Sequence, residues 1–284
     1  MARNSRTTYL LLSLLLLIIS VRSASGYVFY TSDKNDEPLR WFAETVRIYV
    51  STAVTSNLAT EDLIDSTEQA LDAWNAISEC ALPTLVYTGT SDTEVGGFLS
   101  GGNNENLVVP ITDSDVWAAQ GYSNIVLAMT TLSYKRTSGR IVDTDISLNN
   151  WKFSFSVVDP VPPDGIDLLN TLTHEVGHLL GLDHSVDPHA TMFAVAPDGE
   201  SKKRSLEEDD ILGVCDLYTP FPDIPASEDL AGGTDIAGGS NNGGCRAGSK
   251  SGSSGSLIIL LAGLALIVRR RALSPAFLPV RERP

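Results

Sequence analysis

The stretch from Thr173 to His184 constrains the fold more than any other part of this chain of 284 residues. His174 and His178 are four residues apart, so in a helix both imidazoles lie on one face, one turn apart. Gly181 stands where such a helix would end, because glycine readily adopts the left-handed conformation that turns a chain sharply. That turn can bring His184 back beside the other two histidines. The segment therefore predicts a helix carrying two ligands of a metal site and a turn that supplies a third.

The same helix has an apolar stripe that would dock it in a core. The members of the stripe recur at helical spacing on the face opposite the histidines: Leu169, Leu172, Val176, Leu179 and Leu180. Separate metal and core faces are what a working site inside a globular domain requires.

The residue types in this stretch point to hydrolytic chemistry. Three neutral imidazoles on a divalent ion leave a fourth position for water, which is the arrangement of a catalytic zinc site. Glu175 directly follows the first ligand, so its carboxylate can reach that water without binding the metal. We expect one zinc ion on His174, His178 and His184, with Glu175 as the general base that takes the water's proton and delivers it to the leaving amine.

This pattern resembles the metzincin metallopeptidases, and among them the matrixin-like group. Ser185 after the third histidine is the matrixin choice, and Met192 corresponds to the methionine of the family's Met-turn. The resemblance extends over about residues 39–218. It implies an α/β (α+β) zincin domain with a twisted mixed sheet, a long active-site helix and a small C-terminal subdomain that ends in a helix. It also implies a zinc endopeptidase acting on proteins or peptides.

The resemblance also implies how a substrate binds. Leu127 and Ala128 fall where the family has its edge strand beside the cleft, so an extended peptide could add there by main-chain hydrogen bonds. Residues 193–195, Phe-Ala-Val, replace the usual Tyr-Pro after the methionine, which leaves the shape of the main specificity pocket open.

The sequence also bears on two further metal sites. No His-x-Asp occurs between Gly89 and Asn149, so we expect no counterpart of the second, structural zinc of vertebrate matrixins. Calcium could bind at Asp143 and Asp145. Residues that alternate on a strand can also simply face solvent, and that alternative stays open.

The rest of the globular part alternates strand and helix patterns, which favours an α/β or α+β sheet domain. A helix should follow Thr60 as its N-cap. Ser205 and Glu208 form a capping-box pattern before a helix that runs towards Tyr218. The expected strands are 46–50, 84–88, 107–111, 124–132 and 140–148.

Residues 1–26 are typical of a secretory signal peptide. Arg3 and Arg6 precede an apolar run from Tyr9 to Val21, and small residues follow up to Gly26. The run is shorter than the roughly 20 residues that span a bilayer as a helix, so a retained anchor is the weaker alternative. We therefore expect residues 27–225 to be an exported catalytic domain.

Export to an oxidising compartment allows a disulfide to persist. Cys80 follows a predicted helix and Cys215 lies in another, so we expect these two to pair and to close a long loop. Cys245 is left over in a glycine-rich setting, where we expect an exposed sulfur with a separate purpose.

The C-terminal end predicts a tether and an anchor. Residues 226–255 are half glycine or serine, a composition typical of a linker. Residues 256–268 form a short hydrophobic helix, and the basic tail 269–284 should stay cytoplasmic by the positive-inside rule, with the globular part outside. A stretch this short fits a removable anchor better than a permanent one.

The segment from Gly243 to Arg271 resembles the myxobacterial sorting signal known as MYXO-CTERM. The resemblance implies that Cys245 is the residue at which the protein is processed and attached to the cell surface by sorting machinery. An ordinary single-pass anchor with an incidental cysteine is the alternative.

The chain's charge narrows the function further. Its 35 acidic and 20 Lys and Arg residues give a formal net charge of -15, which argues against a nucleic-acid partner. We expect a monomeric, secreted or surface-anchored enzyme. One alternative is a non-catalytic zinc-binding or adhesion module on the same fold, against which the intact Glu175 argues. Another is a hydrolase that acts on a non-peptide amide.

Overall fold

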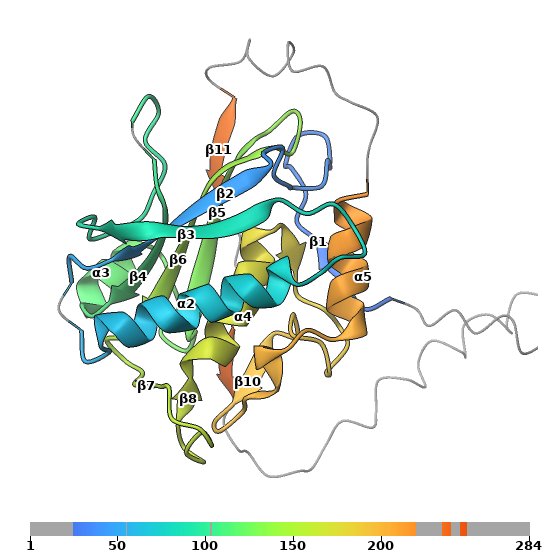
Figure 1. The fold of residues 1–284 in the computed structure, drawn as a ribbon. Coiled ribbons are helices and arrows are strands. Elements are labelled where there is room, and N and C mark those ends of the chain that lie inside the picture. The colour runs from blue at the N-terminus through green and yellow to red at the C-terminus, as the bar shows by residue number, and fades with distance from the viewer. Residues whose placement is uncertain (1–24, 55, 103, 220–234, 240–244, 249–284) are drawn as a thin grey trace, which may run out of the picture. The chain divides into compact units, whose positions relative to one another are not determined.

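The computed structural model describes residues 25–54, 56–102, 104–219, 235–239 and 245–248. Its largest element is a mixed sheet of six strands (Figure 1). The strand order is β11-β5-β6-β4-β2-β3. Strands β3, β2, β4 and β6 run parallel, β5 is antiparallel to β6, and β11 is antiparallel to β5. The strands are β2 (Thr45–Ser51), β3 (Thr84–Ser91), β4 (Asn106–Ile111), β5 (Ala128–Lys135), β6 (Ile141–Asn149) and β11 (Ile236–Gly239).

The helices are α2 (Thr60–Asn75), α3 (Ser114–Ala119), α4 (Leu168–Leu179) and α5 (Glu208–Leu217), with a 3-10 turn η1 (Lys202–Arg204). Three two-stranded pairs complete the fold. They are β1 (Val28–Phe29) with β9 (Leu182–Asp183), β7 (Phe155–Ser156) with β8 (Ile166–Asp167), and β10 (Val195–Pro197) with β12 (Arg246–Gly248). This is the mixed α/β architecture that the sequence predicts.

The main core lies between the sheet and the two long helices, α2 and α4 (Figure 1). Strand β2 alternates as predicted, so that Val46, Ile48 and Val50 all face this core. From α2, Trp74 is fully buried and its Nε1–H donates to the carbonyl of Thr173 at 2.9 Å. This bond ties α2 to α4 just before the first histidine.

The opposite sheet face is covered in part by α3, a helix that the sequence patterns did not reveal. Its Trp117 packs with Val109 and Ile111 of β4. The helix begins at an Asp113 N-cap, whose carboxylate accepts hydrogen bonds from the amides of Asp115 and Val116. Aspartate is a favoured N-cap residue, so Asp113 is the sequence feature that could have predicted the start of α3.

Two expected helix starts are wrong by one or two residues. Helix α2 has Ala59 at its N-cap, and Thr60 is already its first helical residue. Helix α5 has a capping box made by Glu207 and Asp210, not by Ser205 and Glu208. The physical reason is that the buried Asp210 carboxylate accepts hydrogen bonds from the Glu207 amide and from the loop that contains Met192.

Cys80 and Cys215 form a disulfide, which is the expected pairing. It joins the segment after α2 to α5, with a sequence separation of 135 between the two half-cystines and a Cα–Cα distance of 5.3 Å. The covalent link closes most of the globular chain into one loop.

The chain divides into a unit of residues 1–249 and a unit of residues 250–284. The second unit, with the predicted hydrophobic helix 256–268 and basic tail 269–284, lies outside the described residues, as does most of the predicted signal peptide 1–26. Within the described part, no helix is long and apolar enough to cross a membrane. The predicted linker 226–255 contributes the strands β11 and β12, so the expectation of a plain tether is wrong for those stretches.

Candidate metal centre and active site

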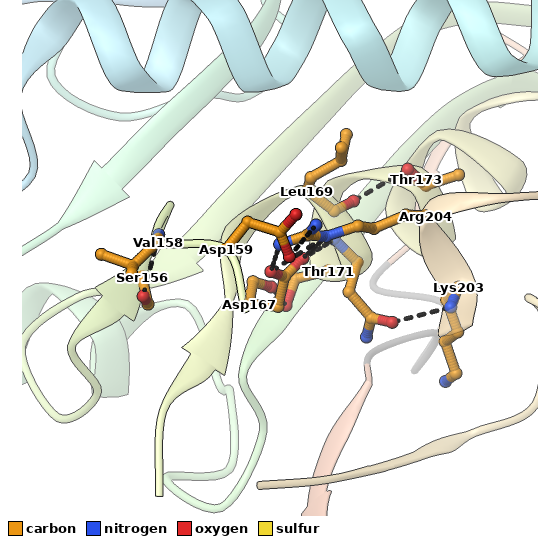
Figure 2. Close-up of polar contacts among 10 residues, drawn as sticks. Ser156, Val158, Asp159, Asp167, Leu169, Thr171, Thr173, Lys203 and Arg204 are labelled. Carbon is orange, nitrogen blue, oxygen red and sulfur yellow. Dashed lines mark hydrogen bonds and ion pairs between the residues drawn. The ribbon is translucent and has the colours of Figure 1, made fainter. Parts of the chain in front are cut away.

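Helix α4 starts at a firmly held N-cap (Figure 2). The carboxylate of Asp167 accepts a hydrogen bond from the amide of Asn170 at 2.6 Å, which satisfies one of the free donors of the first turn. The Arg204 guanidinium binds both oxygens of the same carboxylate and also reaches Asp159 at 3.2 Å. A forked ion pair of this kind fixes the helix direction as well as its start.

The structure brings the three predicted ligands together at the other end of α4. One ligand atom from each of His174, His178 and His184 can be chosen so that all lie within 4.8 Å of one another. The Nε2 atoms of His174 and His178 are 3.2 Å apart. Both of these rings are fully buried.

Backbone carbonyls orient two of the rings. Nδ1 of His174 lies 2.6 Å from the Thr191 carbonyl, and Nδ1 of His178 lies 2.8 Å from the Leu182 carbonyl. A carbonyl can only accept, so Nδ1 carries the proton in each ring and Nε2 presents its lone pair. Burial lowers the pKa of both histidines well below the usual range, and neighbouring positive groups add to the effect. Both rings are therefore neutral, the form that binds a metal.

A zinc ion fits this donor set. Two nitrogens at a Zn–N distance of about 2.0–2.1 Å in tetrahedral geometry stand roughly 3.3 Å apart. The observed Nε2 separation of 3.2 Å matches that spacing. Two lone pairs facing each other at this distance would repel without a cation, so the arrangement suits a divalent ion.

Glu175, the predicted base, is fully buried on the same helix. Its Oε2 accepts a hydrogen bond from the Thr130 hydroxyl at 2.6 Å, and its Oε1 lies 3.3 Å from the amide nitrogen of Cys245. Burial raises the pKa of this carboxyl to about 7, against the lowering effect of those hydrogen bonds. A group that titrates near neutral pH can both take and return a proton. No sequence signal distinguished Thr130 from other strand residues.

The turn after α4 explains the glycine of the motif. Gly181 has φ of +105°, and a Cβ there would clash with the Leu39 carbonyl oxygen. Only glycine fits both constraints. The chain then pairs through β9 and places His184 opposite the helix.

Met192 is buried against Gly177 of α4, where a Cβ would meet its sulfur. The carbonyl of Met192 accepts a hydrogen bond from the amide of Ser185 at 2.9 Å. Asp210 holds this loop from α5, since its carboxylate accepts from the amides of both Thr191 and Met192. Asp210 thereby supports His174 through Thr191, a role that the sequence patterns did not reveal.

The environment of Cys245 corrects a prediction. We expected an exposed sulfur, and the residue is fully buried. It packs with Leu127, Ile166 and Ala196, and its carbonyl accepts a hydrogen bond from the Leu127 amide at 2.8 Å. Burial raises the pKa of the thiol to about 12. The prediction failed because a glycine-rich composition shows only that a segment cannot form a core of its own. It does not show whether a residue such as Cys245 packs into the core of the neighbouring domain.

Ala128 is the first residue of β5 and Leu127 directly precedes it, and both residues of this predicted substrate-binding pair are buried. Without β11, β5 would be the edge of the sheet. The substrate role of the two residues stays a prediction.

Lys203 is a second residue that the sequence patterns did not single out. Its side chain is fully buried, and its ammonium contacts the Phe193 carbonyl and lies 3.6 Å from Sγ of Cys245. Its amide donates to Asn170 at 2.8 Å, so η1 is fastened to α4 (Figure 2). Residues 193–195, which stand where the family usually has Tyr-Pro, therefore lie beside the buried ammonium group of Lys203.

Asp143 and Asp145, the calcium candidates, are buried on one face of β6 and do not face solvent. Burial raises the pKa of Asp143 to about 6, and burial with the nearby Asp143 raises that of Asp145 to about 8. Within the described part of the chain, the only cluster of at least three potential metal-binding side chains is the histidine cluster. Calcium binding stays a prediction.

Comparisons with known proteins agree with this geometry. The family model described as Matrixin matches residues 40–219. The chain is 28% identical to Metalloendoproteinase 1-MMP of Arabidopsis thaliana over 196 residues, 67% of this chain and 47% of that protein. It is 44% identical to Matrilysin of Homo sapiens and 48% identical to Karilysin of Tannerella forsythia, each over 54 residues. Those two alignments cover 19% of this chain and, respectively, 20% and 11% of the relative. The chain thus spans less than half the length of these curated relatives.

Proposed function

Because the chain belongs to the matrixin family, we propose that it is a zinc-dependent endopeptidase that hydrolyses peptide bonds of protein or peptide substrates. One observation carries the proposal. Glu175 shares helix α4 with two of the three clustered histidines, and its carboxylate faces the main-chain N–H of an extended segment at 3.3 Å. A metal site, a base and a peptide backbone meet at this point.

The residues that would hold zinc are His174, His178 and His184. Zinc bound there supplies a Lewis acid for the scissile carbonyl and lowers the pKa of a bound water towards ~7. The carbonyls of Thr191 and Leu182 keep two of the imidazoles in the correct tautomer.

Glu175 moves the proton. Its carboxylate takes a proton from the attacking water and delivers it to the nitrogen of the leaving amine. Thr130 holds Oε2, which leaves Oε1 for the substrate nitrogen, at the place where the amide nitrogen of Cys245 lies 3.3 Å away. Burial excludes bulk water from this exchange.

Substrates would bind in an extended conformation. The amide of Leu127 and the edge of β5 at Ala128 offer main-chain hydrogen bonds on one side, and β10 offers them on the other. Side chains that follow the scissile bond would enter the apolar region bordered by Ile166 and Lys203.

We also propose that the protein is exported and held at the cell envelope through its C-terminal segment. The support is the signal-peptide pattern of residues 1–26, the anchor pattern of residues 256–268, and the Cys80–Cys215 disulfide, which suits an oxidising compartment.

Assays of the purified chain for zinc content and for cleavage of casein, mixed peptides and small non-peptide amides test the proposal. We expect cleavage of the peptides, loss of activity with a chelator, and recovery when zinc is added. Cleavage of non-peptide amides alone would favour the alternative hydrolase. Bound zinc without cleavage of any substrate would favour a binding module.

A further inference from the structure

The segment Cys245–Gly248 occupies the place that the proposed mechanism assigns to a substrate. Strand β12 runs parallel to β10, with Arg246 opposite Val195 and Gly248 opposite Pro197. On the other side, the Cys245 carbonyl accepts a hydrogen bond from the Leu127 amide at 2.8 Å. The segment is therefore held in an extended form by main-chain contacts on both sides.

The part of the tail before this segment follows the same sheet edge. Strand β11 is antiparallel to β5, with Ile236 opposite Lys135 and Gly239 opposite Leu132. The contact of Cys245 with Leu127 continues in the same direction along the chain that leads into β5. Two separate stretches of the tail thus bind one edge with one polarity, as a single extended peptide would.

The register places one peptide bond of the tail next to Glu175, the proposed general base. The amide nitrogen of Cys245 lies 3.3 Å from Oε1 of Glu175, while Thr130 takes the other carboxylate oxygen. In the proposed mechanism, this carboxylate protonates the nitrogen of the leaving amine. The nitrogen in that position belongs to the bond between Gly244 and Cys245.

The side chain of Cys245 completes the fit. It is fully buried among Leu127, Ile166 and Ala196, with Lys203 at 3.6 Å from the sulfur. A buried side chain next to the nitrogen defines the register more strongly than backbone pairing alone, because a shift by one residue would remove it from this site.

We propose that the protein cleaves its own chain between Gly244 and Cys245. The inference rests on the proposed function. Water adds across the amide bond: the C–N bond breaks, Gly244 gains a carboxylate, and the nitrogen of Cys245 becomes a free amine after it receives the proton from Glu175. Nothing is oxidised or reduced. The reaction separates the histidine-bearing domain from the residues that follow position 244, and so would release it from the C-terminal segment by which we propose it is first held at the cell envelope.

The full chain, produced in detergent with zinc, tests this. We expect intact mass to show a product ending at Gly244, and N-terminal sequencing of the smaller fragment to begin at Cys245. Cleavage within one molecule should have a rate constant that does not change on dilution. The Glu175→Gln chain should stay whole.

Two variants at the cleavage site sharpen the test. Cys245→Pro removes the N–H that contacts Glu175. It should therefore block cleavage of the tail and also loosen the segment from the cleft, so that added peptides can enter and be cleaved. Cys245→Ser keeps the N–H and a small polar side chain and should be cleaved about as fast as the natural chain.

The failures are distinguishable. A natural chain that stays whole while it, or Cys245→Pro, cleaves added peptides overturns self-cleavage and leaves the endopeptidase proposal standing. Cleavage at another bond, or at a rate that rises with concentration, also overturns it. If the natural chain stays whole and neither protein cleaves any peptide, both proposals fall.

Discussion

The hydrogen bond from Thr130 to Glu175 is the residue-level feature on which the proposed proton transfer depends. It is short, buried and made to a carboxylate, and such bonds stabilise the charged form by roughly 1.5–3 kcal/mol. In the proposed mechanism, the Thr130 hydroxyl is therefore a positioning group for Glu175.

Thr130→Val should lower kcat by about tenfold or more, because a methyl group of similar size replaces the donor and leaves Oε2 unpaired. The pKa of Glu175 should rise further, so the acid limb of the activity profile should move to higher pH. Thr130→Ser, which keeps the hydroxyl, is the control. Unchanged kcat and an unchanged profile in Thr130→Val, measured with zinc content intact, would contradict this role.

Asp145 makes stability depend on pH. Its pKa is raised to about 8 in the fold, whereas a carboxyl in an unfolded chain titrates near ~4. The folded protein therefore holds a proton that the unfolded chain releases. This contribution to the free energy of unfolding is complete below about pH 4 and is lost as pH rises through about 8.

We expect the melting temperature to fall between pH 5 and pH 8 in metal-chelated buffer, and Asp145→Asn to flatten that slope. Thermal unfolding of both proteins across the range checks this. A natural chain that becomes steadily more stable from pH 5 to pH 8, with the same slope in Asp145→Asn, would show that the carboxyl is ionised in the fold.

At the scale of elements, the active site depends on how α4 is ended. Gly181 combines a positive φ with close contact to the Leu39 carbonyl, whereas at Gly121, with φ of +78°, a Cβ would meet no atom within 4 Å. A side chain at Gly121 would therefore incur only the strain of a positive φ, whereas a side chain at Gly181 would also clash with the Leu39 carbonyl.

Gly121→Ala should lose only about 1–2 kcal/mol of stability, the usual effect of a left-handed residue with a side chain. Gly181→Ala should lose clearly more and also bind zinc more weakly, because the backbone must move where it leads to His184. Chemical unfolding and zinc titration of both variants measure this. Equal losses of stability with unchanged zinc affinity would refute the steric account.

Sequence patterns predict an element well when the interactions that stabilise it show up as a local pattern of residues. Helix α4 was predictable because its ligand spacing and its apolar stripe are both local. Strand β2 was predictable because its alternation matches its burial. Strand β5 begins at Ala128 and not at residue 124, and α3 and the true caps of α2 and α5 were missed.

The remaining features arise from long-range contacts. Asp210 supports Thr191 and Met192 from 19 and 18 residues away, and Thr130 meets Glu175 across 45 residues. The strands β11 and β12 form on partners that are distant in the chain, as their pairing with Lys135 and Val195 shows. Spacing patterns report only on neighbours, so these partners could not be foreseen.

At the scale of the whole molecule, the site lies where three parts of the fold meet. The sheet supplies Thr130, α4 supplies Glu175 and two histidines, and the segment between α4 and α5 supplies His184 and Met192. The disulfide at Cys215 ties α5 to the segment after α2. Each part is held to the others by contacts that bring the three histidines together and leave His174 and His178 buried.

The measurement that tests the central claim most directly compares the natural chain with Glu175→Gln for both zinc content and peptide turnover. Both proteins should hold about one zinc per chain, since Glu175 is not a ligand. Turnover by Glu175→Gln should fall by roughly 10²- to 10⁴-fold, the usual contribution of a general acid–base group. Natural turnover by the zinc-loaded variant, or a natural chain that binds no zinc, would contradict the account.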